Sequence, residues 1–160
     1  MMCANPKAPC RRIRFHRPLV SIWTALTLIG GDRPEEIIAL IEEGQLRFAF
    51  DVRTKRAKTR EIRILGSSIN EFLAGRRAPA ISEQEDFNLA MQAVFPAPKP
   101  VIPAFEIARA WNVSPDHLIN LCRGRELNLV KGARIRRGRG GSPMVETRSA
   151  TEFLRQRRML

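Results

Sequence analysis

The spacing of apolar positions in the last third of the chain predicts two helices joined by a tight turn. The first runs from Ala104 to Trp111, and Asn112 after it can adopt the left-handed conformation of a turn. Ser114 then caps a second helix, which is expected to end near Gly124. The positions predicted to face inward on these helices are Phe105, Ile107, Ala108, Trp111, Leu118, Ile119, Leu121 and Cys122.

Shorter apolar stretches follow, with the length and composition of β-strands. Residues 127–130 and 144–147 are the strand candidates, and a glycine- and arginine-rich stretch, residues 131–142, joins them. A last helix is predicted after Ser149, with Glu152 three residues later as the second half of a capping box. The order is therefore helix, turn, helix, hairpin, helix.

The first half of the chain has the same order of elements. Gly30-Gly31 is predicted to form the turn, and Gly44 to end the second helix. The other elements expected are helices at about 21–29 and 34–43, strands near 46–52 and 61–65, and a closing helix after Ser67 or Ser68.

The two halves are an internal repeat, because a shift of 81 positions aligns them without a gap. Identical residues cluster at apolar, capping and basic positions, which makes a chance match a poor explanation. The identical pairs are Pro34–Pro115, Ile38–Ile119, Leu40–Leu121, Leu46–Leu127, Arg53–Arg134, Arg56–Arg137, Ser68–Ser149, Glu71–Glu152, Phe72–Phe153, Leu73–Leu154, Arg76–Arg157 and Arg77–Arg158.

The segment between the repeats differs in charge and composition. Residues 1–77 hold 15 Lys and Arg against 8 Asp and Glu, residues 104–160 hold 12 against 5, and residues 78–103 hold 1 against 3. A helix is predicted at 82–95, whose apolar residues (Phe87, Leu89, Ala90, Met91, Val94) could pack on either repeat, and residues 96–103 predict a stiff proline-rich spacer. The expected divisions are 1–18, a basic arm; 19–77, the first domain; 78–103, the linker; and 104–160, the second domain.

The formal net charge of +12 indicates a polyanionic partner, since phosphates neutralised by Lys and Arg release counterions. Aromatic residues make up only 6%, which argues against stacking of single-stranded bases. No apolar run approaches membrane-spanning length. Cys3, Cys10 and Cys122 form no C-x-x-C pair, which fits a reducing compartment, and Cys122 is expected in the core.

Short motifs recur along the two repeats. Gly44-Gln45-Leu46 matches a "G-x-L" strand start, and 68–73 and 149–154 match an "S-x-x-E-F-L" closing helix. The small, turn and apolar positions of the helix-turn-helix pattern fall on Ala108, Asn112 and Leu118, and on Thr27, Gly31 and Ile37. In these motifs the repeats resemble the winged helix-turn-helix units of phage excisionases and MerR-type regulators. The resemblance implies an α+β, mainly α fold: two tandem winged domains, each of three short helices and a two-stranded hairpin, joined by a helix and a proline-rich linker.

In such families the hairpin loop, or wing, contacts the DNA backbone or minor groove. Both loops here concentrate cations, and a nearby phosphate chain would relieve the repulsion between them. The alternative interpretation is a solvated loop that is kept basic for solubility. The predicted phosphate contacts are Arg53, Lys55, Arg56, Lys58 and Arg60 in the first loop, with Arg63 beside them, and Lys131, Arg134, Arg136, Arg137 and Arg139 in the second.

The second helix of such a unit enters the major groove. In the second repeat its outward residues are Ser114, His117, Asn120 and Arg123, which are predicted base contacts or else ordinary surface polar groups. In the first repeat the corresponding helix presents Glu35, Glu36, Glu42 and Glu43. Phosphates would repel these carboxylates, so that helix is expected to face protein, with some of the carboxylates paired to arginines of the same unit.

The N-terminal arginines Arg11, Arg12 and Arg14 have two open interpretations. They could enter a minor groove as homeodomain arms do, or they could belong to a disordered tail.

Nothing in the sequence predicts an enzyme, a metal site or a cofactor. The two histidines, His16 and His117, are far apart, and no phosphate-binding glycine motif is present. The expected function is sequence-directed binding of double-stranded DNA at adjacent half-sites, as a recombination directionality factor or a transcriptional regulator of a mobile element. The expected location is the bacterial or phage-associated nucleoid in the cytoplasm, with a recombinase or transcription protein as partner. A protein-interaction adaptor and an RNA binder are the alternatives.

Overall fold

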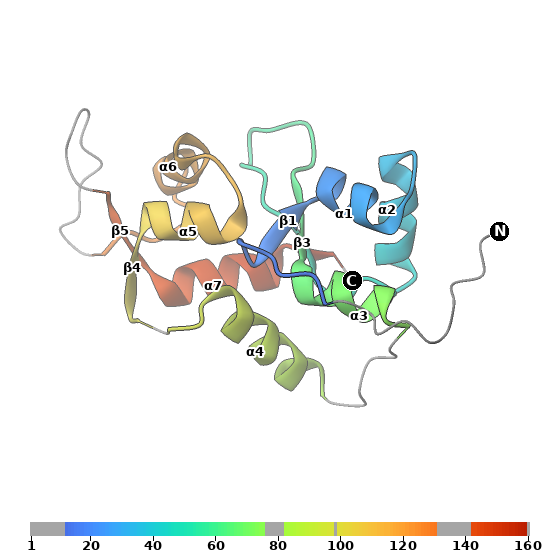
Figure 1. The fold of residues 1–160 in the computed structure, drawn as a ribbon. Helices are drawn as coiled ribbons and strands as arrows, with labels where there is room; N and C mark the ends of the chain where they lie inside the picture. The colour runs from blue at the N-terminus through green and yellow to red at the C-terminus, as the bar shows by residue number, and fades with distance from the viewer. Residues whose placement is uncertain (1–11, 76–81, 98, 131–141, 160) are drawn as a thin grey trace.

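The computed structural model describes residues 12–75, 82–97, 99–130 and 142–159. This part of the chain forms an α+β fold with seven helices, one four-stranded and one two-stranded antiparallel sheet (Figure 1), as the α+β expectation required. In chain order the elements are β1 (Leu19–Ser21), α1 (Ile22–Ile29), α2 (Pro34–Glu42), β2 (Ala49–Asp51), β3 (Ile62–Leu65), α3 (Gly66–Leu73), α4 (Glu83–Val94), β4 (Val101–Pro103), α5 (Ala104–Trp111), α6 (Pro115–Arg123), β5 (Met144–Glu146), α7 (Thr147–Gln156) and β6 (Arg158–Met159).

The internal repeat is visible in the structure as two units, unit 1 from β1 to α3 and unit 2 from β4 to α7, with the short strand β6 at the end of unit 2. Their helices α1 and α5 start 82 positions apart, whereas α2 and α6 start 81 apart. The turn of unit 1 is therefore one residue longer, and the gap-free alignment was wrong before it. The left-handed residues are Gly30 (φ 88°) and Asn112 (φ 55°), so Gly30 and not Gly31 takes the turn position.

Each unit begins with a strand that the sequence analysis missed. β1 pairs with β3 and β4 pairs with β5, both antiparallel. Three-residue strands are too short to show an alternating pattern, and β4 lies inside the stretch predicted as a proline-rich spacer. Of the two strands predicted at 127–130 and 144–147, only the second is a strand, as β5. Residues 127–130 meet β5 through one bridge, Leu129 opposite Val145, and the Val130 N–H donates to the Met144 carbonyl at 3.0 Å.

The larger sheet has the strand order β1-β3-β2-β6 and contains residues of both units. Its edge strand β6 follows α7 and pairs with β2, so that Phe50 lies opposite Arg158. The Asp51 N–H also donates to the Arg157 carbonyl at 3.0 Å. The end of unit 2 therefore completes the sheet of unit 1.

The two faces of this sheet pack against different layers. Val20, Ala49 and Ile64 face an apolar cluster formed with α1, α2 and α3. Phe50 and Leu65 belong to a second cluster, which extends through α4 into the interior of unit 2. Because successive strand residues point to opposite faces, the sheet serves both layers, and the two units share an interior.

Helix α4 packs on both units, which answers the question the sequence left open. Phe87, Ala90, Met91 and Val94 are buried in the shared cluster, whereas Leu89 is 56% exposed. Asp86 pairs with Arg47 of unit 1, and the Arg155 guanidinium of α7 lies 4.8 Å from the Phe87 ring centroid. The helix starts with a capping box of Ser82 and Glu85, in which the Ser82 hydroxyl and backbone N–H lower the pKa of Glu85.

The serines of the two "S-x-x-E-F-L" motifs do not cap helices, so that expectation was wrong. Helix α3 begins two residues before Ser68 and helix α7 begins two residues before Ser149, so both serines lie inside the helices. Ser68 accepts a hydrogen bond from the Arg47 N–H at 2.8 Å, and Ser149 accepts one from the Asn128 N–H at 2.7 Å. Donors and acceptors are each 81 positions apart, so the repeat preserves a bond that fixes the start of the hairpin.

Of the side chains of unit 2 predicted to face inward, Cys122 confirms the helical pattern and Phe105 departs from it. Cys122 is buried as expected, and burial raises the pKa of its thiol to about 11. Phe105, predicted to face inward, is 54% exposed at the start of α5, and Trp23 at the equivalent position of α1 is 62% exposed.

The second residue after the end of α2 and of α6, just beyond each C-cap, offers a test of backbone strain. Gly44 and Arg125 are equivalent positions in the left-handed region, with φ 73° and 58°. An L-residue there costs roughly 1–2 kcal/mol, and Arg125 is exposed. We expect Arg125→Gly to raise the free energy of unfolding by about 1 kcal/mol in chemical denaturation.

The matched variant is Gly44→Ala, because a Cβ at Gly44 would meet no atom within 4 Å and its cost would be conformational alone. We expect it to lower the free energy of unfolding by about 1 kcal/mol. Opposite signs for the two substitutions are required; a destabilised Arg125→Gly variant would contradict the strain at Arg125.

Candidate nucleic-acid interface

The loop between β2 and β3, residues 52–61 (hairpin 1), has a well-fixed base. The Val52 N–H donates to the Glu61 carbonyl at 2.9 Å, and Asp51 Oδ1 accepts from the Arg53 and Glu61 N–H groups, both at 3.2 Å. Arg53 also pairs with Asp51, Nε to Oδ2 at 3.1 Å, and donates to the Lys58 carbonyl. Arg53 therefore holds the loop in shape and is not a free cation.

The other predicted cations of hairpin 1 are available to a ligand. Lys55, Arg56, Lys58 and Arg60 are all exposed. None of them pairs with a carboxylate in the described part of the chain. Four unpaired cations on one short loop create a concentrated positive potential.

Hairpin 1 lies against α6 of unit 2. His117 Nε2 donates to the Val52 carbonyl at 2.6 Å, and its Nδ1 is 3.2 Å from Glu61 Oε2. Arg63, half-buried beside them, pairs with Glu61 at 2.8 Å and donates from Nε to the Asn112 carbonyl at 3.0 Å. Burial lowers the pKa of Arg63 although Glu61 opposes that shift. Arg63 therefore joins the two units instead of reaching outward.

A carboxylate of unit 2 completes this junction. Glu126, whose side chain is 3% exposed, accepts from the Lys55 N–H at 3.2 Å and from Arg157 Nη2 at 3.0 Å. It fixes the hairpin backbone at Lys55 next to the end of α6.

A cavity of about 610 Å³ opens between hairpin 1 and α6. Its lining comes from both units: Thr54, Lys55 and Arg56 from the hairpin, and Asn120, Arg123, Gly124 and Glu126 from α6 and the residues after it. We call hairpin 1 together with the outer face of α6 the composite surface.

The four predicted base contacts of α6 separate into two groups. Asn120 and Arg123 are exposed, line the cavity, and have no hydrogen bond or ion pair through their side chains in the described part of the chain. Ser114 is exposed, but its hydroxyl caps α6 by accepting from the His117 N–H at 3.1 Å. His117 is turned into hairpin 1, so its expected outward position was wrong.

The acidic helix α2 takes no part in the composite surface. Glu35, Glu36, Glu42 and Glu43 are exposed as expected. None of them pairs with an arginine among the described residues, although such pairs were anticipated. In Figure 1, α2 lies at the opposite end of the molecule from α6.

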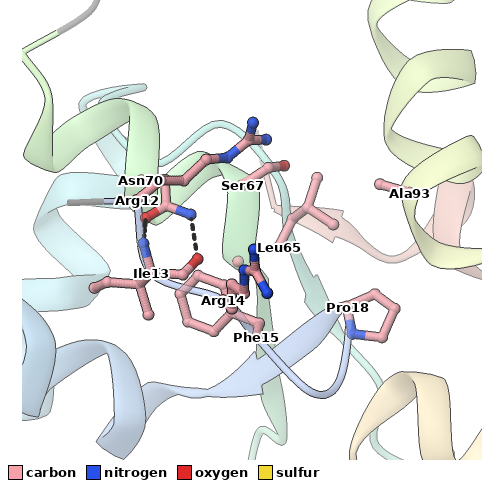
Figure 2. A pocket seen from close by; sticks show the side chains of 10 residues that line it. Arg12, Ile13, Arg14, Phe15, Pro18, Leu65, Ser67, Asn70 and Ala93 are labelled. Carbon is pink, nitrogen blue, oxygen red and sulfur yellow. Dashed lines mark hydrogen bonds between the residues drawn. The ribbon is translucent and has the colours of Figure 1, made fainter. Parts of the chain in front are cut away.

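The N-terminal arm, described from Arg12 to Pro18, is attached to unit 1 (Figure 2). Ile13 exchanges two hydrogen bonds with the Asn70 side chain, at 3.0 and 2.9 Å, and a Cβ at Gly66 would clash with the Phe15 ring. Arg12 and Arg14 are exposed, whereas Arg17 donates to the Asn112 side chain of unit 2. Of the two interpretations of the arm, a free tail does not describe residues 12–18.

Several predicted contacts fall outside the described residues. They are Arg11 of the arm and the whole second wing set, Lys131, Arg134, Arg136, Arg137 and Arg139.

Sequence reasoning missed Glu61, Glu126 and the junction role of His117. His117 contacts Val52, 65 positions away, and Glu126 contacts Lys55, 71 positions away. A local sequence pattern does not predict pairs that are so far apart. The one usable signal was that Glu61 is the single acid in an otherwise basic loop.

Among the described residues there is no group of three or more His, Cys, Asp and Glu that could hold a metal ion, and no helix of sufficient length and apolarity to cross a membrane. Comparison with known proteins found no matching family model, no similar curated protein and no similar solved structure.

Proposed function

We propose that this chain is a sequence-directed double-stranded DNA-binding protein that acts as an excisionase-like recombination directionality factor or a transcriptional regulator of a mobile element. Unit 1 has the order strand, helix, turn, helix, hairpin, helix, and unit 2 has the same order with a single bridge, Leu129 opposite Val145, in place of the first hairpin strand. This order is compatible with a winged helix-turn-helix. The net charge of +12 supports a nucleic-acid partner. A recombinase or transcription protein would be the further partner.

The observation that carries the proposal is the composite surface. Four cations of hairpin 1, without a carboxylate partner among the described residues, can neutralise phosphates. Beside them, Asn120 and Arg123 have the side chains that pair with adenine and guanine edges. The hairpin of unit 1 thus serves as the wing for the second helix of unit 2. One stretch of duplex would meet both units, and we propose one continuous site in place of two separate half-sites.

Selection of random duplex DNA on the full chain tests the proposal. We expect a recovered consensus whose affinity falls steeply with salt, and a single uninterrupted protected region in a footprint of that site. Equal binding to duplex DNA, RNA and other polyanions would identify a nonspecific binder instead. Absence of nucleic-acid binding would leave the protein-interaction adaptor as the remaining hypothesis.

Substitutions on α6 separate base reading from phosphate contact. We expect Asn120→Ala and Arg123→Ala each to weaken binding to the selected site by about 1–3 kcal/mol and to relax the preferred base at one position. The measurement is a repeated selection with each variant. Arg33→Ala removes an exposed cation before α2 and should leave the consensus unchanged; an unchanged consensus for both α6 variants would remove α6 from base reading.

An adaptor role is favoured by one observation, the four exposed carboxylates of α2 without an ion pair among the described residues. Phosphates repel such a face, so a protein would be its partner. We expect Glu42→Ala with Glu43→Ala to change self-association, measured by sedimentation, or DNA affinity. If neither changes, α2 does not have the protein-facing role assigned to it.

A further inference from the structure

A groove runs between α4 and the N-terminal arm, apart from the composite surface. It consists of two adjoining cavities of about 680 and 650 Å³, which share Phe15, Pro18 and Ala93. Figure 2 shows the first cavity. Ala93 of α4 lies on one side of the cavity and faces the arm and Leu65 on the other side. The second continues past the end of α4 to α5. No residue lines both this groove and the cavity beside α6.

The floor of the groove is apolar, and its far end carries an exposed aromatic ring. Leu65, Val94 and Ile102 are buried beneath it, and Phe105 is 54% exposed. Around Phe105, the exposed residues Ala93, Pro96 and Ala97 also line the second cavity. Exposed apolar groups gathered in one cavity are typical of an interaction site, since their contact with water is unfavourable.

The rim of the groove is basic. Arg12 and Arg14 line the first cavity, and Lys99 and Arg109 line the second, against one carboxylate, Glu106. All four cations are exposed, and none pairs with a carboxylate among the described residues. The two bonds between Ile13 and Asn70 hold the arm in place, so the groove needs no rearrangement to form.

We propose that this groove binds an acidic segment of a partner protein that carries an apolar anchor residue. Carboxylates of the segment would pair with the guanidinium groups of the rim, and the anchor would pack on Phe105. A peptide fits better than DNA because the DNA backbone has no apolar group to cover Phe105. This inference does not depend on the proposed DNA binding, since the two surfaces share no lining residue.

The test uses random twelve-residue peptides displayed against the full chain in excess random duplex DNA, which occupies nucleic-acid surfaces. We expect the recovered peptides to be enriched in Asp and Glu around one Leu, Phe or Trp. The consensus peptide, fluorescein-labelled, is then titrated with purified variants. Phe105→Ala and Arg109→Glu should each weaken its binding by about tenfold or more.

Trp23→Ala is the matched control, because Trp23 is an equally exposed aromatic at the equivalent position of unit 1 and lines neither cavity. It should leave peptide affinity unchanged, and Arg14→Glu, at the other end of the groove, should weaken it. A variant is used in the titration only if its melting temperature is close to that of the parent chain. Recovery of no peptide, of peptides without acidic enrichment, or of peptides insensitive to Phe105→Ala overturns the proposal. So does a loss of duplex affinity in Phe105→Ala as large as the loss of peptide affinity, which would assign the groove to nucleic acid.

Discussion

Replacing Lys55, Arg56, Lys58 and Arg60 together with Ala is expected to weaken duplex DNA binding by about 1000-fold at 0.15 M salt. Each phosphate contact releases counterions and gives a slope of about −0.9 in log K against log salt. At 0.15 M salt, relative to the 1 M reference, four such contacts therefore raise the affinity by about three powers of ten. We therefore also expect the slope to become shallower by about 3.6. Binding titrations over a range of salt concentrations measure both quantities.

The loop should survive these substitutions because its base is held by other groups. Asp51 accepts from two backbone N–H groups and pairs with Arg53, and Glu126 bonds to the backbone of Lys55 rather than to its side chain. The control is Arg33→Ala with Lys99→Ala, two exposed cations that do not line the cavity beside α6. A salt slope that stays at the parent value would show that hairpin 1 does not contact phosphates.

The local features of the fold were predictable because local residues cause them. Ser114, Pro115 and a left-handed Asn112 fix the start of α6 and the turn before it, and the structure has all three in those roles. The repeat was predictable for the same reason, since equivalent apolar and turn positions recur along the chain. Its gap-free alignment failed for the strand and helix before the turn, because the turn of unit 1, where Gly30 lies in the left-handed region, has one residue more.

The arrangement of the two units was not predictable, because the residues that determine it are far apart in sequence. The strand β6 is two residues long and pairs with a strand more than one hundred positions earlier. Phe50 lies in a strand whose successive side chains point to opposite faces of the sheet. That pattern alone does not reveal that the face carrying Phe50 packs against unit 2. The closing-helix serines were misassigned for a related reason: a serine followed by Glu three residues later satisfies the capping pattern, yet both hydroxyls bond to a hairpin backbone.

The candidate site was predicted in composition but not in assembly. Lys55, Arg56, Asn120 and Arg123 were each named from charge or helix face, but as members of two separate readers. Their union on the composite surface depends on His117 and Glu126, whose contacts join unit 2 to hairpin 1. The interior that the two units share supports these contacts from below.

The shared interior leads to the second large expected effect, which is on stability. Trp111 is fully buried, and its ring stacks on Phe153 with centroids 5.4 Å apart. We expect Trp111→Ala to lower the free energy of unfolding by about 3–5 kcal/mol, through lost apolar contacts and the cavity left behind. The cluster around Trp111 includes Phe50 and Leu65 of the sheet, so the loss should spread to unit 1.

Hydrogen exchange followed by mass spectrometry measures that spread. We expect peptides covering residues 22–42, which pack on the other face of the sheet, to lose protection together with peptides covering residues 104–123, because one cooperative transition opens both. Trp23→Ala, at an exposed tryptophan, should change stability by less than about 0.5 kcal/mol and serves as the control. If residues 22–42 keep their parental protection in Trp111→Ala while residues 104–123 lose theirs, the units are independent domains. Hairpin 1 would then be free to move relative to α6, and a single rigid composite surface could not be the DNA-binding site.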